Sequence, residues 1–233
     1  MNLIIMRLAL ELRDMIFQIQ SLVHGVCETP RVRIFDSDLH DVLKLRRTFR
    51  YSFGSEVATC SIGVCLRQDA KIGVACVASF IHDPREPLHD CFAVFPHRLQ
   101  NYLGFPVENT RSMTGDDEYH AIRRIFLSFA FHETRHQLCL RNPDIRLRNL
   151  DEIFSDPRFP FVKSEQYMRD VMDARKFLLS LLPYSEKFFS LEQRKKMEED
   201  AFIAEAIGFH SYPLYRDGRL SELAVVLRQF VLQ

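Results

Sequence analysis

The sequence predicts an α+β fold, in which a small sheet is followed by a helical C-terminal half. Residues 56–80 consist of short runs rich in Val, Ile, Thr and Cys, which are typical of strands. From about residue 116 onward, apolar residues recur at helical spacing and prolines fall in the gaps between helical segments. Strands grouped before helices, and not alternating with them, favour α+β over α/β.

The composition is that of a globular chain of one domain. The chain has 233 residues, 47% of them hydrophobic and 27% charged, which excludes a disordered or fibrous protein. We expect a single domain over residues 1–233, with a helix and sheet half at 1–115 and a helical half at 116–233. Thirty-one basic residues balance 31 acidic ones, so we expect no nucleic-acid partner.

The first element is a predicted amphipathic helix over residues 1–25. Its apolar residues, such as Leu8 and Leu12, follow helical spacing. Arg7 and Glu11 interrupt the apolar run well before the roughly 18 residues that a membrane span needs. We therefore expect neither a membrane partner nor a secretory signal. The six cysteines lack the spacing of a disulfide framework, which favours the cytoplasm.

The first half then continues with predicted strands. Residues 56–66 and 71–80 are expected to pair as a hairpin, because a polar stretch separates them. The runs 32–35 and 91–95 are further short strands. The basic stretch Lys44–Arg50 is expected to be a solvated helix face. The second half is predicted to contain helices at 116–141, 164–182, 190–209 and 218–232.

The helix at 116–141 carries an HExxH motif, His132-Glu133-Thr134-Arg135-His136. Two histidines four residues apart lie one turn apart on one helical face, so both imidazoles can reach one tetrahedral zinc ion. Glu133 projects beside them and can take a proton from a metal-activated water. Chance would produce the motif in roughly one in fifty chains of this composition. The alternative is a pair of core histidines held by ordinary hydrogen bonds.

A catalytic zinc site needs a third protein ligand. The extended motif with a third histidine is excluded, because Cys139 and Asn142 stand at its remaining positions. The predicted helix at 190–209 offers Glu198, which borders a stripe of small residues that would allow a close approach to another helix. Glu199 is the rival ligand, since it lies on the most apolar stripe of the same helix. Both could instead belong to a solvated run of charges.

The two motifs resemble those of the gluzincin metallopeptidases, most closely the ImmA/IrrE-like and other minimal zincins. Their glutamate helix reads roughly E-x-x-A-[ND]-x-[FA]-A, which aligns Glu198 with the ligand and Ala201 with the first alanine. Two positions depart from this pattern. Phe202 stands where Asn or Asp is usual, and Glu205 stands where the last alanine is usual. The resemblance covers residues 90–210 and implies a zincin-like fold.

The resemblance also implies a function, a zinc-dependent metallopeptidase acting on a protein or peptide substrate. Zinc would be held by His132, His136 and Glu198, with Glu133 as general base. The substrate would lie as an extra strand along a sheet edge, which we expect to be the strand at 91–95. Candidate donors to the oxyanion follow the glutamate helix and are His210, Tyr212 and Tyr215.

Two other functions remain open. The chain could be a catalytically inactive zincin-like module that binds metal or a partner for regulation, which the apolar Phe202 favours. The intact Glu133 favours catalysis, because a structural site has no use for that carboxylate. The third possibility is a hydrolase of a non-peptide amide. Cys139 is expected to be a packing thiol, with ligation to the metal as the alternative. The sequence does not determine the oligomeric state.

Overall fold

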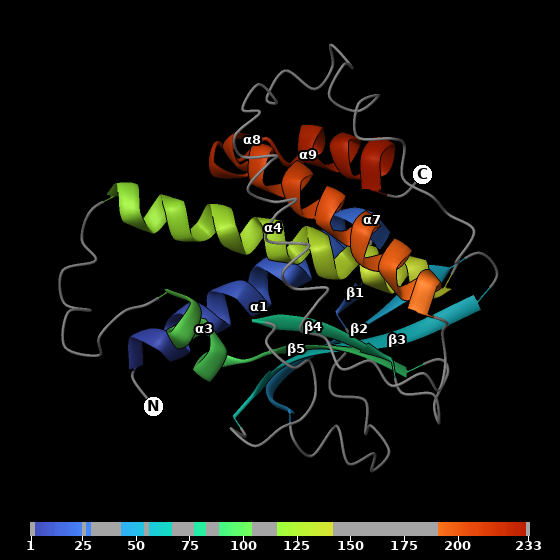
Figure 1. Ribbon diagram of the computed structural model, residues 1–233, viewed down its shortest axis with the longest axis horizontal. Coiled ribbons are helices and arrows are strands. Elements are labelled where there is room, and N and C mark those ends of the chain that lie inside the picture. The colour runs from blue at the N-terminus through green and yellow to red at the C-terminus, as the bar shows by residue number, and fades with distance from the viewer. Residues whose placement is uncertain are drawn as a thin grey trace.

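The computed structural model describes residues 3–24, 27–28, 43–53, 56–66, 77–82, 89–103, 116–141 and 191–231. The helices in these ranges are α1 (Leu3–His24), α3 (Pro96–Leu103), α4 (Asp116–Arg141), α7 (Leu191–His210), α8 (Tyr212–Arg216), α9 (Leu220–Val226) and the π-helix η2 (Leu227–Val231). The strands are β1 (Cys27–Glu28), β2 (Leu43–Phe53), β3 (Glu56–Cys65), β4 (Ala78–His82) and β5 (His89–Val94). Figure 1 shows α1, α4 and α7 layered over the sheet, which confirms the α+β class.

The sheet is mixed and has the strand order β1-β2-β3-β5-β4. β3 and β5 run parallel, whereas the other neighbouring pairs are antiparallel. The predicted hairpin between 56–66 and 71–80 is therefore wrong, because β5 lies between β3 and β4. The strand predicted at 91–95 is confirmed as β5, but its expected edge position is also wrong. Among the described strands, the edge beside α4 is β4.

Residues 43–53 form strand β2, so the expected helix face at Lys44–Arg50 is wrong. An irregularity in the register between Lys44 and Arg47 breaks the alternation that would have marked a strand. Leu45 has a positive φ of 52° at this point. Gly63 on β3 makes room for the irregularity, since a Cβ there would lie 2.9 Å from Cγ of Arg46.

One hydrophobic core joins the N-terminal and C-terminal halves of the chain. The prediction of an amphipathic N-terminal helix is confirmed, because α1 buries Leu8, Leu12 and Ile16 against the sheet and α4. Within the described ranges, no helix combines the length and the apolar character needed to cross a membrane. The strand predicted at 32–35 and the helix predicted at 164–182 lie outside the described residues.

Helices α4 and α7 pack closely along their length. Ala201 and Ala204 are fully buried in the contact, and a Cβ at Gly208 would lie 2.8 Å from Cγ of Phe131. The small-residue stripe that the sequence places on this helix thus brings two backbones together. This close packing brings the HExxH helix and the glutamate helix into one site.

Candidate metal centre

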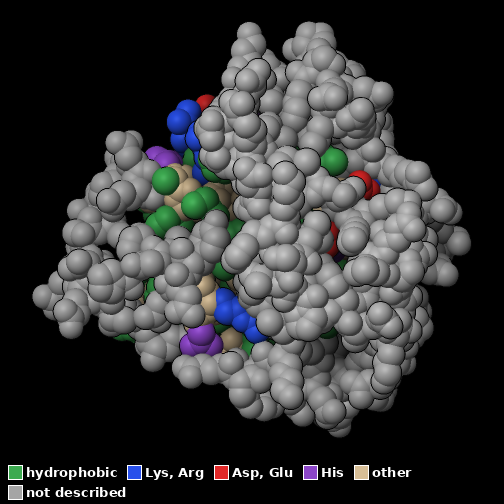
Figure 2. All heavy atoms as spheres, viewed as in Figure 1, with side chains coloured by type: hydrophobic (Ala, Val, Ile, Leu, Met, Phe, Trp, Pro, Cys, Tyr) green, Lys and Arg blue, Asp and Glu red, His purple; other side chains and the backbone are tan. Residues whose placement is uncertain are grey.

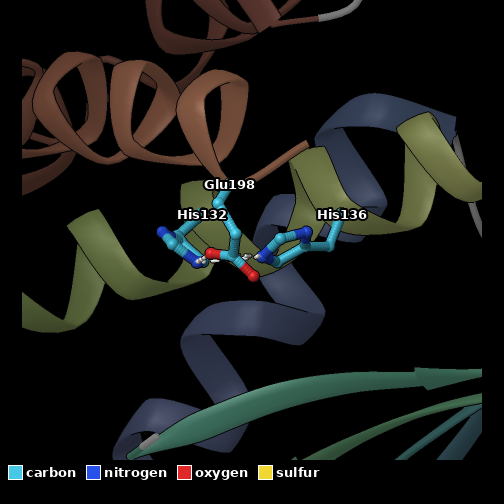
Figure 3. Close-up of side chains that lie close together, drawn as sticks. All are labelled: His132, His136 and Glu198. Carbon is cyan, nitrogen blue, oxygen red and sulfur yellow. Dashed lines mark hydrogen bonds and ion pairs between the residues drawn. The ribbon is translucent and has the colours of Figure 1, made fainter. Parts of the chain in front are cut away.

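Three side chains from two helices converge at the crossing of α4 and α7 (Figure 3). His132 and His136 project from successive turns of α4, and Glu198 reaches down from α7. The two Nε2 atoms lie 3.0 Å apart. Oε2 of Glu198 is 3.6 Å from Nε2 of His136 and 3.9 Å from Nε2 of His132. The structure therefore brings together the three residues that the sequence proposes as ligands.

The geometry of the three ligand atoms fits a small divalent cation. Metal–ligand bonds of about 2.0–2.1 Å in a tetrahedral site put neighbouring ligand atoms roughly 3.3 Å apart. The three separations of 3.0, 3.6 and 3.9 Å bracket that value. Imidazole and carboxylate donors suit zinc and several other first-row metals. The side chains are 13% exposed in His132, 15% in His136 and 21% in Glu198, so the cluster is not sealed from water.

Glu198 and His132 each favour the charged form of the other. Burial alone would raise the pKa of Glu198, but its close contact with the imidazole of His136 and attraction to His132 together lower this pKa to about 2. Burial alone would lower the pKa of His132, but the hydrogen bond to Glu205 and three nearby carboxylates raise it to about 9. Both shifts favour an ionised Glu198 beside a protonated His132.

Glu133 lies on α4 beside the two histidines and is 5% exposed. The backbone N–H of Phe80 on β4 donates a hydrogen bond to its Oε2. Burial raises the pKa of Glu133, while attraction to His132 and His136 and the hydrogen bond from Phe80 oppose the rise. This carboxylate is therefore held at the edge of the sheet with its affinity for protons increased, as a general base requires.

Glu205 also contacts the cluster, although the sequence indicates no role for it beyond a departure from the family pattern. Its Oε2 is 3.0 Å from Nδ1 of His132. The phenyl ring of Phe202 packs edge-on against the same imidazole, with ring centroids 5.2 Å apart. The sequence feature that could have identified Glu205 is its spacing from Glu198. The two residues are seven apart and so share one face of α7.

The other two residues of the motif hold α4 in place. Arg135 is fully buried and donates hydrogen bonds to Oδ2 of Asp200 on α7 and to the carbonyl oxygen of Val231. Thr134 is also fully buried, and its Oγ1 accepts a hydrogen bond from Nε2 of Gln20 on α1. The motif helix is thus fixed from both sides by polar contacts within the core.

The expected oxyanion donors do not join the cluster. The hydroxyl of Tyr212 bonds Nδ1 of His120, which lies twelve residues before His132, or about 18 Å along the helix axis. The hydroxyl of Tyr215 donates to Gln18 on α1. His210 stands at the far end of α7, also roughly 18 Å along its helix from Glu198. The sequence expectation for these three residues has no support in the geometry.

The remaining sequence candidates are Cys139 and Glu199. Cys139 is a buried free thiol, and burial raises its pKa to about 11. Cys139 is not among the described side chains that converge as candidate ligands, so the geometry supports packing as its role. The side chain of Glu199 lies outside the described part of the structure.

Comparison of the chain with models of protein families, with curated proteins and with solved structures gives no match. The likeness to gluzincins accordingly rests on the residues of the HExxH helix and of the glutamate helix. What the chain does is inferred below from the chemistry of this cluster.

Proposed function

We propose that the protein is a zinc-dependent metallopeptidase, a hydrolase with a zincin-like fold of the gluzincin kind. The observation that carries the proposal is the convergence of His132, His136 and Glu198 beside the buried carboxylate of Glu133. Three protein ligands leave one position of a tetrahedral ion for water or substrate. A carboxylate next to that position is needed for catalysis and has no use in a structural site.

A bound zinc ion supplies Lewis-acid chemistry, because it makes water more acidic and polarises a carbonyl group. Glu133 takes a proton from the attacking water, and the water oxygen forms a bond to the carbonyl carbon. Glu133 then passes the proton to the leaving nitrogen as the C–N bond breaks. One water is consumed, and the products are a carboxylic acid and an amine. Phe80 holds one oxygen of Glu133, so we assign proton transfer to the other.

We assign the substrate to the edge of β4. This strand packs against α4 and donates the hydrogen bond to Glu133, so an extended peptide along it would pass the proposed metal. Residues 78, 80 and 82 direct their backbone groups away from β5, because the neighbouring Val77 carbonyl bonds Phe95 on the β5 side. Apart from the N–H of Phe80, which donates to Glu133, these outward groups can pair with a protein or peptide strand.

We place the protein in the cytoplasm. The described residues Cys60, Cys65, Cys91 and Cys139 are buried and form no disulfide with one another, which suits a reducing compartment.

The test compares wild type with Glu133→Gln and with His136→Ala. Zinc content is measured by mass spectrometry after dialysis against a mild chelator, and hydrolysis is followed on a library of quenched fluorescent peptides. We expect about one zinc per chain in wild type and in Glu133→Gln, with activity reduced roughly 100-fold or more in the latter. His136→Ala should lose both zinc and activity.

Two results would contradict the proposal. If folded wild type contains no zinc, the proposed metal site is wrong. If Glu133→Gln keeps full activity, Glu133 is not the general base. Zinc in wild type and in Glu133→Gln without hydrolysis by either would identify the metal-binding regulatory module instead. Hydrolysis of small amides but not of peptides would favour the non-peptide hydrolase.

A further inference from the structure

The two departures from the gluzincin pattern on α7 meet at the same imidazole. Phe202 packs its ring against the ring of His132, and Glu205 places a carboxylate oxygen 3.0 Å from Nδ1 of His132. We propose that Glu205 is the positioning residue of the metal centre, and that it performs from one turn further along α7 the orienting role that a polar residue at position 202 would otherwise perform. The inference rests on the proposed metal site, but not on peptidase activity.

The geometry of the helix crossing gives Glu205 this role. Glu198 and Glu205 lie two turns apart on one face of α7, and His132 lies between their carboxylates. Glu198 faces Nε2 of His132, whereas Glu205 faces Nδ1 on the opposite side of the ring. The carboxylate of Glu205 therefore leaves Nε2 directed at the other ligand atoms, 3.0 Å from Nε2 of His136.

The chemistry of imidazole explains what the contact does. A neutral imidazole has one nitrogen that donates a hydrogen bond and one that accepts. A carboxylate at Nδ1 requires the proton to reside there, which leaves the lone pair of Nε2 for a metal. A carboxylate bonded to a ligating histidine also makes it a stronger electron donor.

Phe202 contributes by packing. Its side chain is 7% exposed, and its edge-on contact restricts rotation of the imidazole without any hydrogen bond. An apolar residue at position 202 is thus compatible with an oriented ligand, so the sequence argument from Phe202 for an inactive site loses its force.

The experiment measures zinc affinity by competition with a chromophoric chelator, with circular dichroism to confirm folding. The variants are Glu205→Gln, Glu205→Ala and Phe202→Asp combined with Glu205→Ala. Glu222→Gln serves as control, because Glu222 is an exposed carboxylate of α9 that pairs with Arg219 at the start of the same helix, away from α7. Nitrogen-15 spectra of the zinc-loaded proteins report whether the Nδ1–H proton of His132 is protected from exchange with water.

We expect Glu205→Ala to weaken zinc binding about 10- to 100-fold and to lose the protected Nδ1–H signal. Glu205→Gln should keep part of the zinc affinity and part of the protected Nδ1–H signal, because an amide oxygen still accepts the hydrogen bond. The double variant should bind zinc at least tenfold more tightly than Glu205→Ala, because an aspartate at position 202 lies next to the same imidazole. The control should match wild type.

Zinc affinity of folded Glu205→Ala within twofold of wild type would overturn the proposal, as would an unchanged Nδ1–H signal. A double variant no tighter than Glu205→Ala would overturn the exchange of roles between positions 202 and 205. These readouts do not involve hydrolysis, so a failure of the peptidase proposal shows up separately, as a zinc-binding protein without activity.

Discussion

Among single residues, His132 has the largest effect on the proposed metal site, because carboxylates lie on both sides of its ring. Glu205 faces Nδ1 and Glu198 faces Nε2. Burial disfavours the imidazolium, but these carboxylates and Glu133 outweigh burial and raise the pKa of His132 to about 9. The metal-free histidine therefore holds a proton at neutral pH, and this proton must leave before Nε2 can bind a metal.

Zinc binding is accordingly expected to release about one proton per chain at pH 7. Titration calorimetry in buffers of different ionisation enthalpy measures the number directly. The apparent affinity should rise roughly tenfold per pH unit from pH 7 and level off near pH 9, where His132 has lost its proton. An affinity that stays constant between pH 7 and 9 would contradict a protonated His132.

At this scale, the sequence predicts the residues that a helix places by its own period. His132, Glu133 and His136 follow from helical spacing alone. Spacing places Glu205 on the same face of α7 as Glu198, but its contact with His132 depends on where α7 crosses α4, which no local pattern encodes. Tyr212 and Tyr215 fail as oxyanion candidates for the same reason, since proximity in sequence to the glutamate helix does not bring them to the cluster.

The helices and strands differ in how far the sequence predicts them. The helix predicted at 116–141 is α4, and the one predicted at 190–209 is α7 within one residue. The helical spacing of their apolar residues is a local feature of the sequence, so it predicts these helices whatever they pack against. The sheet order was missed because the parallel pairing of β3 with β5 joins residues far apart in the chain. The β2 strand was missed because its register irregularity interrupts the alternating pattern.

The contact between α4 and α7 offers a test of how elements position the site. We expect Gly208→Ala to destabilise the fold by about 1–2 kcal/mol, although alanine favours helices, because overpacking outweighs that gain. The added Cβ would lie 2.8 Å from Cγ of Phe131 and 2.9 Å from the carbonyl oxygen of Leu127. Zinc affinity should fall as well, since α7 carries Glu198 and Glu205. Urea denaturation and chelator competition measure the two effects.

Gly218→Ala is the matched control for this prediction. Gly218 has a φ of 70°, so alanine there is strained by about 1–2 kcal/mol, but its Cβ would meet no atom within 4 Å. The control should therefore lose stability while it keeps the zinc affinity of wild type. If Gly208→Ala is as stable as wild type and binds zinc equally well, the close helix contact does not position the site.

The molecule as a whole couples the cluster to folding, because the helices that carry it are part of the core shared by both halves of the chain. Arg135 connects the motif helix to α7 and to η2, and Gln20 connects it to α1. Ligands held in this way come together only in the folded state. Zinc should therefore bind the folded chain far better than the unfolded one and stabilise it.

The pH dependence of stability follows from the two large pKa shifts. His132 has a folded pKa of about 9 against an ordinary 6.5, so its stabilising contribution is complete below pH 6.5 and is lost as the pH rises through 9. Glu198 has a folded pKa of about 2 against 4.5, so its contribution is complete above pH 4.5 and is lost as the pH falls through 2. The raised pKa of Glu133 adds to the loss as the pH rises.

Bound zinc replaces the proton on His132, so the metal-loaded protein should not share the loss of stability above pH 6.5. We expect the melting temperature of metal-free protein to fall between pH 6.5 and 9, and the gap between metal-loaded and metal-free protein to widen over the same range. Differential scanning calorimetry with one equivalent of zinc measures both curves. His132→Asn is the control, because it removes the titrating group and a proposed zinc ligand together. Its metal-free curve should be flatter than that of wild type and should respond little to zinc. A gap in wild type that narrows with rising pH would show that His132 holds no such proton in the folded chain.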